Sequence, residues 1–237
     1  MFLLKCFDLP EIMQNSEVFY YHQILEKRKA SIFFKRIFDI VFSFLFLIIL
    51  SPLFAIVALM VKVDSKGPVV FKQKRYTTAY RPFYIYKFRT MTVDAERNGS
   101  MVTVKDDRRI TRVGKRLRKL RIDELPQLMN VLKGEMSFVG TRPEVEKYVL
   151  AYDHKMLATL LLPAGITSPA SIFYKDEDRL LEQSQQPDKV YIEQILPDKM
   201  KYNLKYIEEF SFFQDIAIIF KTIFSVFLKK EKRETME

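Results

Sequence analysis

Two adjacent acids, Asp123 and Glu124, are the side chains in this sequence best suited to chemistry. They follow a basic run, RRITRVGKRLRKLR (Arg108 to Arg121), which has eight basic residues and no acid. Its charge is expected to keep both carboxylates ionised. Such carboxylates can hold a divalent cation with a diphosphate, and a carboxylate can also attack phosphorus. Acids are common at helix starts, so spacing alone favours a helix cap paired with an arginine.

Two short helices are expected to position the acids. In the segment LPQLMNVLKG, Pro126 suits a first helical turn and Gly134 a C-terminal stop, which places Asp123 and Glu124 at the helix N-terminus. The preceding basic run predicts an amphipathic helix over residues 108–121, because its apolar positions share one face. Those positions are Ile110, Val113, Leu117 and Leu120.

The composition indicates a folded protein with an anionic partner. The 237 residues are 49% hydrophobic and 14% aromatic, which excludes a disordered or low-complexity chain. A formal charge of +10 fits nucleic acid, an anionic membrane face or phosphorylated substrates. The single cysteine, Cys6, excludes an internal disulfide. With only His22 and His154 besides, the sequence favours a hard metal ion held by carboxylates and phosphates over zinc.

Residues 40–61 form an uncharged apolar run of 22 residues, IVFSFLFLIILSPLFAIVALMV. A straight helix of this length rises about 33 Å, enough to cross a hydrocarbon core of roughly 30 Å. Pro52 predicts a sharp bend, because it removes a backbone hydrogen bond and clashes with the carbonyl of Ile48. The hydroxyl of Ser51 can bond a carbonyl that is freed there.

The flanking charges favour a membrane hairpin that returns to its starting side. Lys and Arg flank both ends of the apolar run, so the positive-inside bias places both flanks in the cytoplasm. We therefore expect a re-entrant hairpin with halves 40–51 and 52–61, the alternative being a proline-kinked helix that crosses the membrane. The opening segment MFLLKCFD is too short an apolar run for a secretory signal.

Other elements are expected on both sides of the acids. The runs Val69–Gln73 and Phe83–Lys87 have the β-branched and aromatic content of short strands, which can form a small hairpin. Residues 212–228 predict an apolar helix that lies in the membrane interface or packs on the core. Ser211 and Gln214 fit a capping box at its start. The tail after this helix is expected to be solvated and mobile.

Six blocks of the sequence, in order, resemble the bacterial sugar transferases, which are the monotopic phosphoglycosyl transferases. The blocks are KRIFDIVFSFLFLIILSP (35–52), GPVVFKQKR (67–75), KFRTM (87–91), DDRRITRVGKRLR (106–118), IDELPQLMNVLKGEMSFVGTRPE (122–144) and PAGIT (163–167). They run through most of residues 35–228, and a match of this kind is highly specific. The resemblance reverses the preference for a mere helix cap at Asp123.

The resemblance implies a membrane-bound enzyme of the bacterial inner membrane, with its catalytic domain on the cytoplasmic face. Such an enzyme moves a phosphosugar from a nucleotide diphosphate sugar, usually a UDP-sugar, to a polyprenyl phosphate such as undecaprenyl phosphate, and releases UMP. This step initiates lipid-linked glycan or exopolysaccharide synthesis.

The resemblance also implies roles for particular residues. Asp123 corresponds to the nucleophile that forms a covalent phosphosugar intermediate, and Glu124 corresponds to the second acid, which orients the Mg²⁺-diphosphate. Both acids are the expected metal ligands. The positions expected to contact phosphates are Lys87, Arg118 and Arg142, and the pair Ser51 and Pro52 corresponds to the bend of the re-entrant helix.

Two segments depart from the family pattern. Residues 140–143 read GTRP where GPRP is commoner, and SPASIFYKDEDRLL follows PAGIT where many members carry a tryptophan-containing GWAQV-type segment. The second departure makes the identity of the sugar the least transferable inference. The chain also lacks the several preceding membrane helices of larger members, so it resembles a small, minimal-core form with its own N-terminal extension.

These observations predict a helix-rich α+β fold with four parts. They are an N-terminal extension (1–34), a re-entrant membrane helix (35–62), a compact cytoplasmic catalytic domain (63–228) with a small β element and interfacial amphipathic helices, and a charged tail (229–237). A homodimer on the membrane is compatible with the apolar surface, although lipid alone could cover it.

Three alternatives remain for the function. A nucleic-acid-binding protein fits the basic run but not the apolar segment, so we expect no nucleic acid partner. A non-catalytic membrane scaffold would be expected to lack the acid pair. A membrane-spanning phosphotransferase with a direct, non-covalent mechanism would not need Asp123 as a nucleophile.

Overall fold

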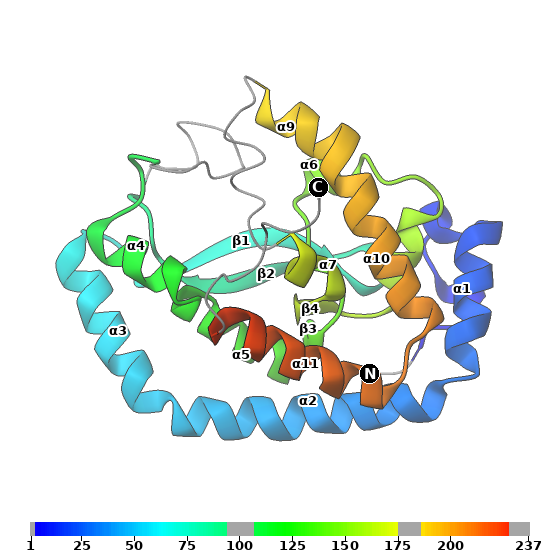
Figure 1. Cartoon of the computed structure of the whole chain (residues 1–237), viewed down its shortest axis with the longest axis horizontal. Helices are drawn as coiled ribbons and strands as arrows, with labels where there is room; N and C mark the ends of the chain where they lie inside the picture. Colours follow the sequence, from blue (N-terminus) through cyan, green and yellow to red (C-terminus); the bar gives the residue numbers. More distant parts are fainter. Residues whose placement is uncertain (1–2, 94–106, 175–185, 228–237) are drawn as a thin grey trace, which may run out of the picture.

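The computed structural model describes residues 3–93, 107–174 and 186–227 (Figure 1). It is a helix-rich α+β fold with small sheets, as expected. In chain order the elements are η1 (Cys6–Asp8), η2 (Glu11–Met13), α1 (Ser16–Glu26), α2 (Lys29–Ile49), α3 (Ser51–Asp64), β1 (Val70–Thr77), η3 (Thr78–Tyr80), β2 (Arg81–Phe88), α4 (Arg112–Lys119), η4 (Ile122–Gln127), α5 (Leu128–Lys133), β3 (Met136–Val139), α6 (Glu146–Val149), η5 (Met156–Leu161), β4 (Ala164–Thr167), α7 (Pro169–Phe173), α9 (Pro187–Val190), η6 (Tyr191–Ile195), α10 (Leu196–Glu208) and α11 (Phe212–Phe227).

Helices α2 and α3 form the long bent pair along the lower and left edges of Figure 1. They meet at an angle of 62°, so the predicted sharp bend is confirmed. The hydroxyl of Ser51 donates to the carbonyl of Ile48 at 2.8 Å, which satisfies the group that Pro52 would leave free. Both helices extend beyond the predicted halves, and the break lies at Leu50. In the described part of the chain no single helix has the length and hydropathy to cross a membrane, whereas the bent pair together does.

Helix α11 lies beside α2 (Figure 1), with Asp215 turned inward and Lys221 exposed. Asp215 and Ile218 are buried, whereas Phe213, Phe220 and Phe224 are exposed. The Ser211 hydroxyl accepts from the backbone N–H of Gln214 at 3.1 Å, as predicted. The side chain of Gln214 donates instead to Glu209, so the reciprocal half of the expected capping box is wrong.

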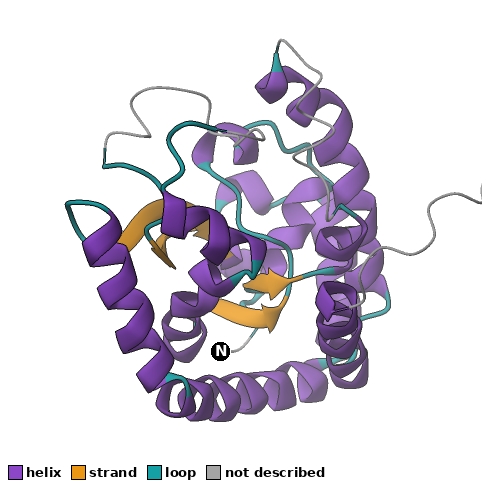
Figure 2. Cartoon of the chain, turned by 60° about the vertical axis from the view of Figure 1, so that its left-hand side comes forward, coloured by secondary structure: helices purple, strands orange, loops and turns teal. Residues whose placement is uncertain are grey.

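Two pairs of strands lie among the helices (Figure 2). β1 and β2 form the predicted hairpin, and each is longer than expected. β3 and β4 form a parallel pair that was not predicted. Glycines allow the chain to approach closely beyond β3, because a Cβ atom on Gly140 would lie 2.2 Å from the carbonyl oxygen of Pro163. Backbone hydrogen bonds then hold the segment after β3 against β4 itself, from Gly140 N–H to the carbonyl of Thr167 and from Gly165 N–H to the carbonyl of Thr141.

The largest hydrophobic cluster joins the N-terminal residues to the rest of the chain. Met13, Val18 and Leu25 are fully buried there with Leu157 and Phe210. The N-terminal extension therefore packs on the domain, which the sequence left open. The predicted division of the chain at residues 34, 62 and 228 stays a prediction, and the charged tail lies outside the described residues.

Helix α4 is shorter than the predicted helix over residues 108–121. It begins at Arg112 because the hydroxyl of Thr111 accepts from the backbone N–H of Gly114 at 3.0 Å. Ile110 lies in a β-bridge with Met91, and Leu120 is exposed, so neither belongs to a buried helix face. Leu117, with the half-buried Val113, packs against α3 and β2.

A buried ionic cluster, which we call the anchor cluster, joins α2 to α11 and β3. It consists of Lys35, Asp39, Ser137, Tyr206 and Asp215. The ammonium of Lys35 donates at 2.6 Å to both Asp215 Oδ2 and the carbonyl of Val139. The other oxygen of Asp215 accepts from Tyr206 at 2.6 Å. Asp39 Oδ1 accepts from the Ser137 hydroxyl and from the N–H of Phe138, at 3.1 Å each.

Candidate active site

The two acids lie in a tight turn between α4 and α5. Arg121 adopts a left-handed conformation (φ 57°), which ends the preceding turn and starts the 3-10 helix η4. Asp123 and Glu124 occupy the first turn of η4, and both are buried. The predicted single helix is divided, because Pro126 lies inside η4 and α5 begins at Leu128. The predicted helix stop is confirmed, because Gly134 takes the left-handed conformation (φ 85°) at the end of α5.

Glu124 lies between two cations from distant parts of the chain. Its Oε1 accepts from Lys87 Nζ on β2 at 2.8 Å and from Arg142 Nη2 at 2.5 Å. Its Oε2 has a longer contact of 3.5 Å with Arg142 Nη1. Burial acts to raise the pKa of Glu124. The positive charges of Arg142 and Lys87 outweigh burial and hold this pKa well below its ordinary value. The pKa of Lys87 is itself lowered, chiefly by burial.

Asp123 has a different environment from its neighbour. It is 8% exposed, and its Oδ1 is buried without a hydrogen-bond partner. Burial, reinforced by the charge of Glu124, raises the pKa of Asp123, while Lys87 and Arg118 act to lower it. This direction is opposite to the one expected from the basic neighbours alone. Asp123 therefore has an ionisable oxygen that nothing in the described chain satisfies.

The structure brings together four of the predicted site residues, namely Asp123, Glu124, Lys87 and Arg142. Arg118 lies half-buried on α4, and its charge favours the ionised form of Asp123. In the described residues its side chain has no hydrogen bond or ion pair with either acid, so the expected contact with phosphate stays a prediction. Ser51 and Pro52 lie at the bend of α2 and α3 and do not contact the acids.

The sequence alone missed a buried cluster behind Arg142. Glu144, two residues further on, accepts from the hydroxyl of Tyr191 and lies 3.7 Å from both Arg75 and Lys199. Arg75 also donates to the carbonyl of Pro143 at 3.1 Å. These contacts fix the backbone that carries Arg142. In the sequence, only Glu144 at the end of GTRPE (140–144) could have pointed to this cluster, because the partners of Glu144 lie far away along the chain.

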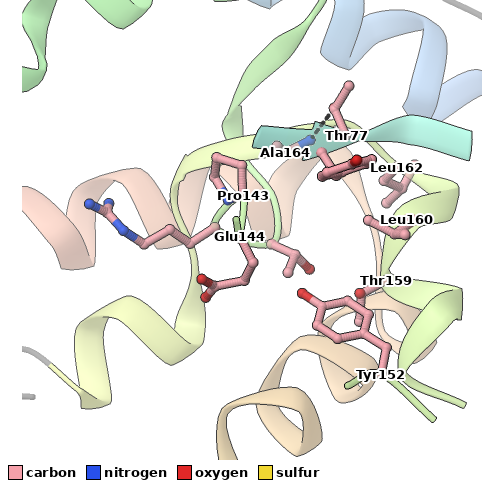
Figure 3. A pocket seen from close by; sticks show the side chains of 11 residues that line it. Thr77, Pro143, Glu144, Tyr152, Thr159, Leu160, Leu162 and Ala164 are labelled. Carbon is pink, nitrogen blue, oxygen red and sulfur yellow. Dashed lines mark hydrogen bonds between the residues drawn. The ribbon is translucent and has the colours of Figure 1, made fainter. Parts of the chain in front are cut away.

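A cavity of about 10 Å³ lies behind Pro143 and Glu144 (Figure 3). Tyr152, Thr159 and Leu160 line its other side. This volume has room for about one water molecule. The cavity therefore cannot hold a sugar or a nucleotide.

The acid pair offers carboxylate oxygens that could hold a magnesium ion shared with substrate phosphates. In the residues that the structure describes, no three His, Cys, Asp or Glu side chains are grouped to hold a metal ion. Mg²⁺ is commonly bound by one or two carboxylates together with substrate phosphates. The unpartnered Oδ1 of Asp123 and the weakly engaged Oε2 of Glu124 fit that arrangement.

Comparisons with known proteins place the chain among relatives of known family. The family model "Bacterial sugar transferase" matches residues 30–229. A UDP-N-acetylgalactosamine-undecaprenyl-phosphate N-acetylgalactosaminephosphotransferase of Aeromonas hydrophila is 37% identical over 199 residues, which are 81% of this chain and 43% of that protein. A UDP-glucose:undecaprenyl-phosphate glucose-1-phosphate transferase of Klebsiella pneumoniae is 39% identical over 202 residues, which are 83% of this chain and 41% of that protein.

The match with a shorter relative covers nearly all of it. The uncharacterized sugar transferase EpsL of Bacillus subtilis (strain 168) is 32% identical over 201 residues, which are 85% of this chain and 91% of that protein. By contrast, the matched part of the chain spans about two fifths of the Aeromonas and Klebsiella proteins. The family model covers most of the chain and these relatives are more than 30% identical to it, so the chain belongs to the bacterial sugar transferase family.

Proposed function

We propose that this chain is an enzyme that transfers a sugar phosphate from a UDP-sugar to a polyprenyl phosphate such as undecaprenyl phosphate and releases UMP. The observation that carries the proposal is the unpartnered carboxylate oxygen of Asp123 beside the cation-bound Glu124. The names of the Aeromonas and Klebsiella relatives support the substrates, because both contain a UDP-sugar and undecaprenyl phosphate. The reaction would initiate the synthesis of a lipid-linked glycan or exopolysaccharide.

Asp123 is the proposed nucleophile. Its carboxylate attacks the phosphorus that bears the sugar, and the bond from that phosphorus to the bridging oxygen breaks, so that UMP leaves with the electron pair. In the second step an oxygen of the polyprenyl phosphate attacks the same phosphorus, and the Asp123 carboxylate leaves. The two steps let one cationic site serve two anionic substrates in turn.

The remaining site residues position and neutralise the diphosphate. Lys87 and Arg142 both donate to Oε1 of Glu124, and their charges suit the phosphate oxygens that approach it. Mg²⁺ held by Asp123 and Glu124 would neutralise further charge on the diphosphate. Arg118 is proposed to contact phosphate from α4, on the side where its charge acts on Asp123.

The membrane position is proposed from the apolar surface. Phe44, Ile48 and Ile49 on α2 are exposed, as are Phe220 and Phe224 on α11. We propose that α2 and α3 enter the inner membrane as a re-entrant hairpin and leave the acids at the cytoplasmic face. The acceptor lipid presents its phosphate at this depth, so the hairpin would help to position it.

The main experiment measures UMP release from a panel of UDP-sugars by the detergent-solubilised protein. Wild type, Asp123→Asn and the exposed control Asp8→Asn are compared, each with Mg²⁺ or EDTA and with or without undecaprenyl phosphate. The expected result is Mg²⁺-dependent release by wild type and by Asp8→Asn, and none by Asp123→Asn. Release by Asp123→Asn at the wild-type rate would remove the covalent mechanism. No release from any UDP-sugar would favour the scaffold alternative.

A second experiment tests the hairpin. Single cysteines at Lys27 and Lys66, in a Cys6→Ser background, are labelled in sealed inverted membrane vesicles with a reagent that does not cross the membrane. A re-entrant hairpin predicts that both positions are labelled from the cytoplasmic side. Labelling of only one would show that α2 and α3 cross the membrane.

A further inference from the structure

A groove of about 440 Å³ lies between the end of α3 and the start of α4. The α3 side is formed by Leu59, Met60 and Val63, and the α4 side by Arg112 and Arg116 together with Val113. Asp64 Oδ2 accepts from the backbone N–H of Val113 at 3.0 Å, which ties the two helix ends together at one end of the groove. The groove is therefore built by two elements that are held in place.

The walls of the groove have opposite chemistry. Leu59 is 67% exposed and Val63 is 80% exposed, so α3 presents bare apolar surface. Arg112 and Arg116 are four residues apart and share one face of α4. In the described part of the chain neither guanidinium makes a hydrogen bond or an ion pair, and both are exposed. A ligand that fills the groove would combine an apolar chain with an anionic head, and Arg recognises phosphate by paired hydrogen bonds.

The location of the groove separates it from the acid pair. Arg118 follows Arg116 by two residues, which turns it about 200° around α4. The face that affects Asp123 is therefore on the other side of the helix. The groove instead continues the exposed apolar surface of α2 and α3, at the point where the chain leaves that surface.

We propose that this groove binds one anionic phospholipid of the membrane, with its acyl chain on Leu59 and Val63 and its phosphate between Arg112 and Arg116. The inference rests on the membrane position given under the proposed function. A lipid bound here fixes the depth and the rotation of α3, and through Asp64 it fixes the start of α4. The site is separate from the one that receives the polyprenyl phosphate.

Vesicle binding tests the proposal. Purified full-length protein is titrated with vesicles of phosphatidylcholine alone or of phosphatidylcholine with phosphatidylglycerol. Wild type is expected to prefer the anionic vesicles, and Arg112→Gln/Arg116→Gln is expected to bind them about thirtyfold more weakly. The matched control Lys201→Gln/Lys205→Gln removes the same charge from exposed positions of α10 and is expected to bind like wild type.

A conservative variant separates a built site from diffuse attraction. Arg112→Lys/Arg116→Lys keeps the charge but loses the paired hydrogen bonds of the guanidinium, so it is expected to bind anionic vesicles more weakly than wild type. Wild-type binding by this variant, or by the glutamine variant, would overturn the proposal. Failure of every variant and of wild type to bind either vesicle would instead refute the membrane position itself.

Activity in detergent distinguishes the two lipids. Arg112→Gln/Arg116→Gln is expected to release UMP and to transfer the sugar phosphate to undecaprenyl phosphate like wild type, because the groove lies away from the acids. Loss of transfer to the acceptor with UMP release unchanged would assign the groove to the polyprenyl phosphate and would overturn the proposal.

Discussion

The anchor cluster and the acid pair both bury charge, but they differ in how completely it is satisfied. In the anchor cluster, Lys35 has two acceptors, and both oxygens of Asp215 accept hydrogen bonds. In the acid pair, Glu124 is held by two cations, whereas Oδ1 of Asp123 has no partner. A satisfied cluster stabilises the fold, and an unsatisfied oxygen keeps its capacity for a ligand or a reaction.

The largest effect is expected for Asp123→Asn, which removes the proposed nucleophile. UMP release should fall by about 10³-fold or more. The stability of the fold should be unchanged or higher, because a carboxylate whose pKa is raised by burial destabilises the native state above its ordinary pKa. Enzyme assay and thermal unfolding of the same preparation check both parts. If Asp123→Asn lowered both the unfolding temperature and UMP release, Asp123 would have a structural role.

Lys35→Met tests the anchor cluster. Removing one partner of a buried ion pair costs about 3–5 kcal/mol of unfolding free energy, since it leaves the other charge without a counter-ion. Denaturant unfolding in detergent measures this loss. The matched control is Lys29→Met, whose ion pair with Glu26 is exposed, and it should unfold like wild type. Equal unfolding free energies for Lys35→Met and Lys29→Met would contradict the expected difference between the buried ion pair and the exposed one.

Glu124→Gln sharpens the contrast within the acid pair. It leaves Lys87 and Arg142 facing a neutral amide, so the unfolding free energy should fall by about 1–3 kcal/mol. The two neighbouring substitutions should therefore change the unfolding free energy differently. Glu124→Gln should lower it, whereas Asp123→Asn should leave it unchanged or raise it. Unfolding curves for both variants test this directly, and a stabilised Glu124→Gln protein would refute the role of the two cations.

Acidification should inactivate the enzyme before it unfolds the chain. The pKa of Asp123 is raised above 3.8, so its nucleophilic form is lost early as the pH falls. The pKa of Glu124 is lowered well below 4.5, so its stabilising contribution is complete above 4.5 and is lost only as the pH falls through its own lower pKa. UMP release and circular dichroism are followed as the pH is lowered from neutral. UMP release should be lost at a higher pH than the circular dichroism signal of the folded chain. Coincident curves would contradict the assignment of the two acids.

The smallest effect is expected at the helix bend. Ser51→Ala removes the hydrogen bond to the carbonyl of Ile48, at a cost of about 1 kcal/mol. The bend itself should remain, because Pro52 and not Ser51 interrupts the backbone bonding. Unfolding in detergent gives the cost, and cysteine labelling of both flanks shows whether the topology is kept. A loss as large as that of Lys35→Met would mean that the hydroxyl determines the bend.

Features encoded by neighbouring residues could be predicted. The bend at Pro52, the hairpin of β1 and β2 and the stop at Gly134 follow from residues that are adjacent or nearly so. The acid pair was predicted on the resemblance, and the structure adds its contacts with Lys87 and Arg142.

Features that depend on distant partners could not be predicted. The strands β3 and β4 have four residues each, and their parallel pairing has no local turn to reveal it. The raised pKa of Asp123 depends on burial, which spacing does not report. Ile110 lies outside helix α4 because it pairs with Met91, a contact between separate segments.

The anchor cluster also has a consequence for biosynthesis. Lys35 and Asp215 are 180 residues apart, so α2 emerges from the ribosome long before its partner helix α11. At about 5–20 residues per second, translation of the intervening chain takes roughly 10–40 s. During that interval Lys35 lacks its ion-pair partner Asp215, and Asp39, one turn further along α2, is the acid whose charge still acts on it. The contact between α2 and α11 can therefore form only after the chain between them has been made.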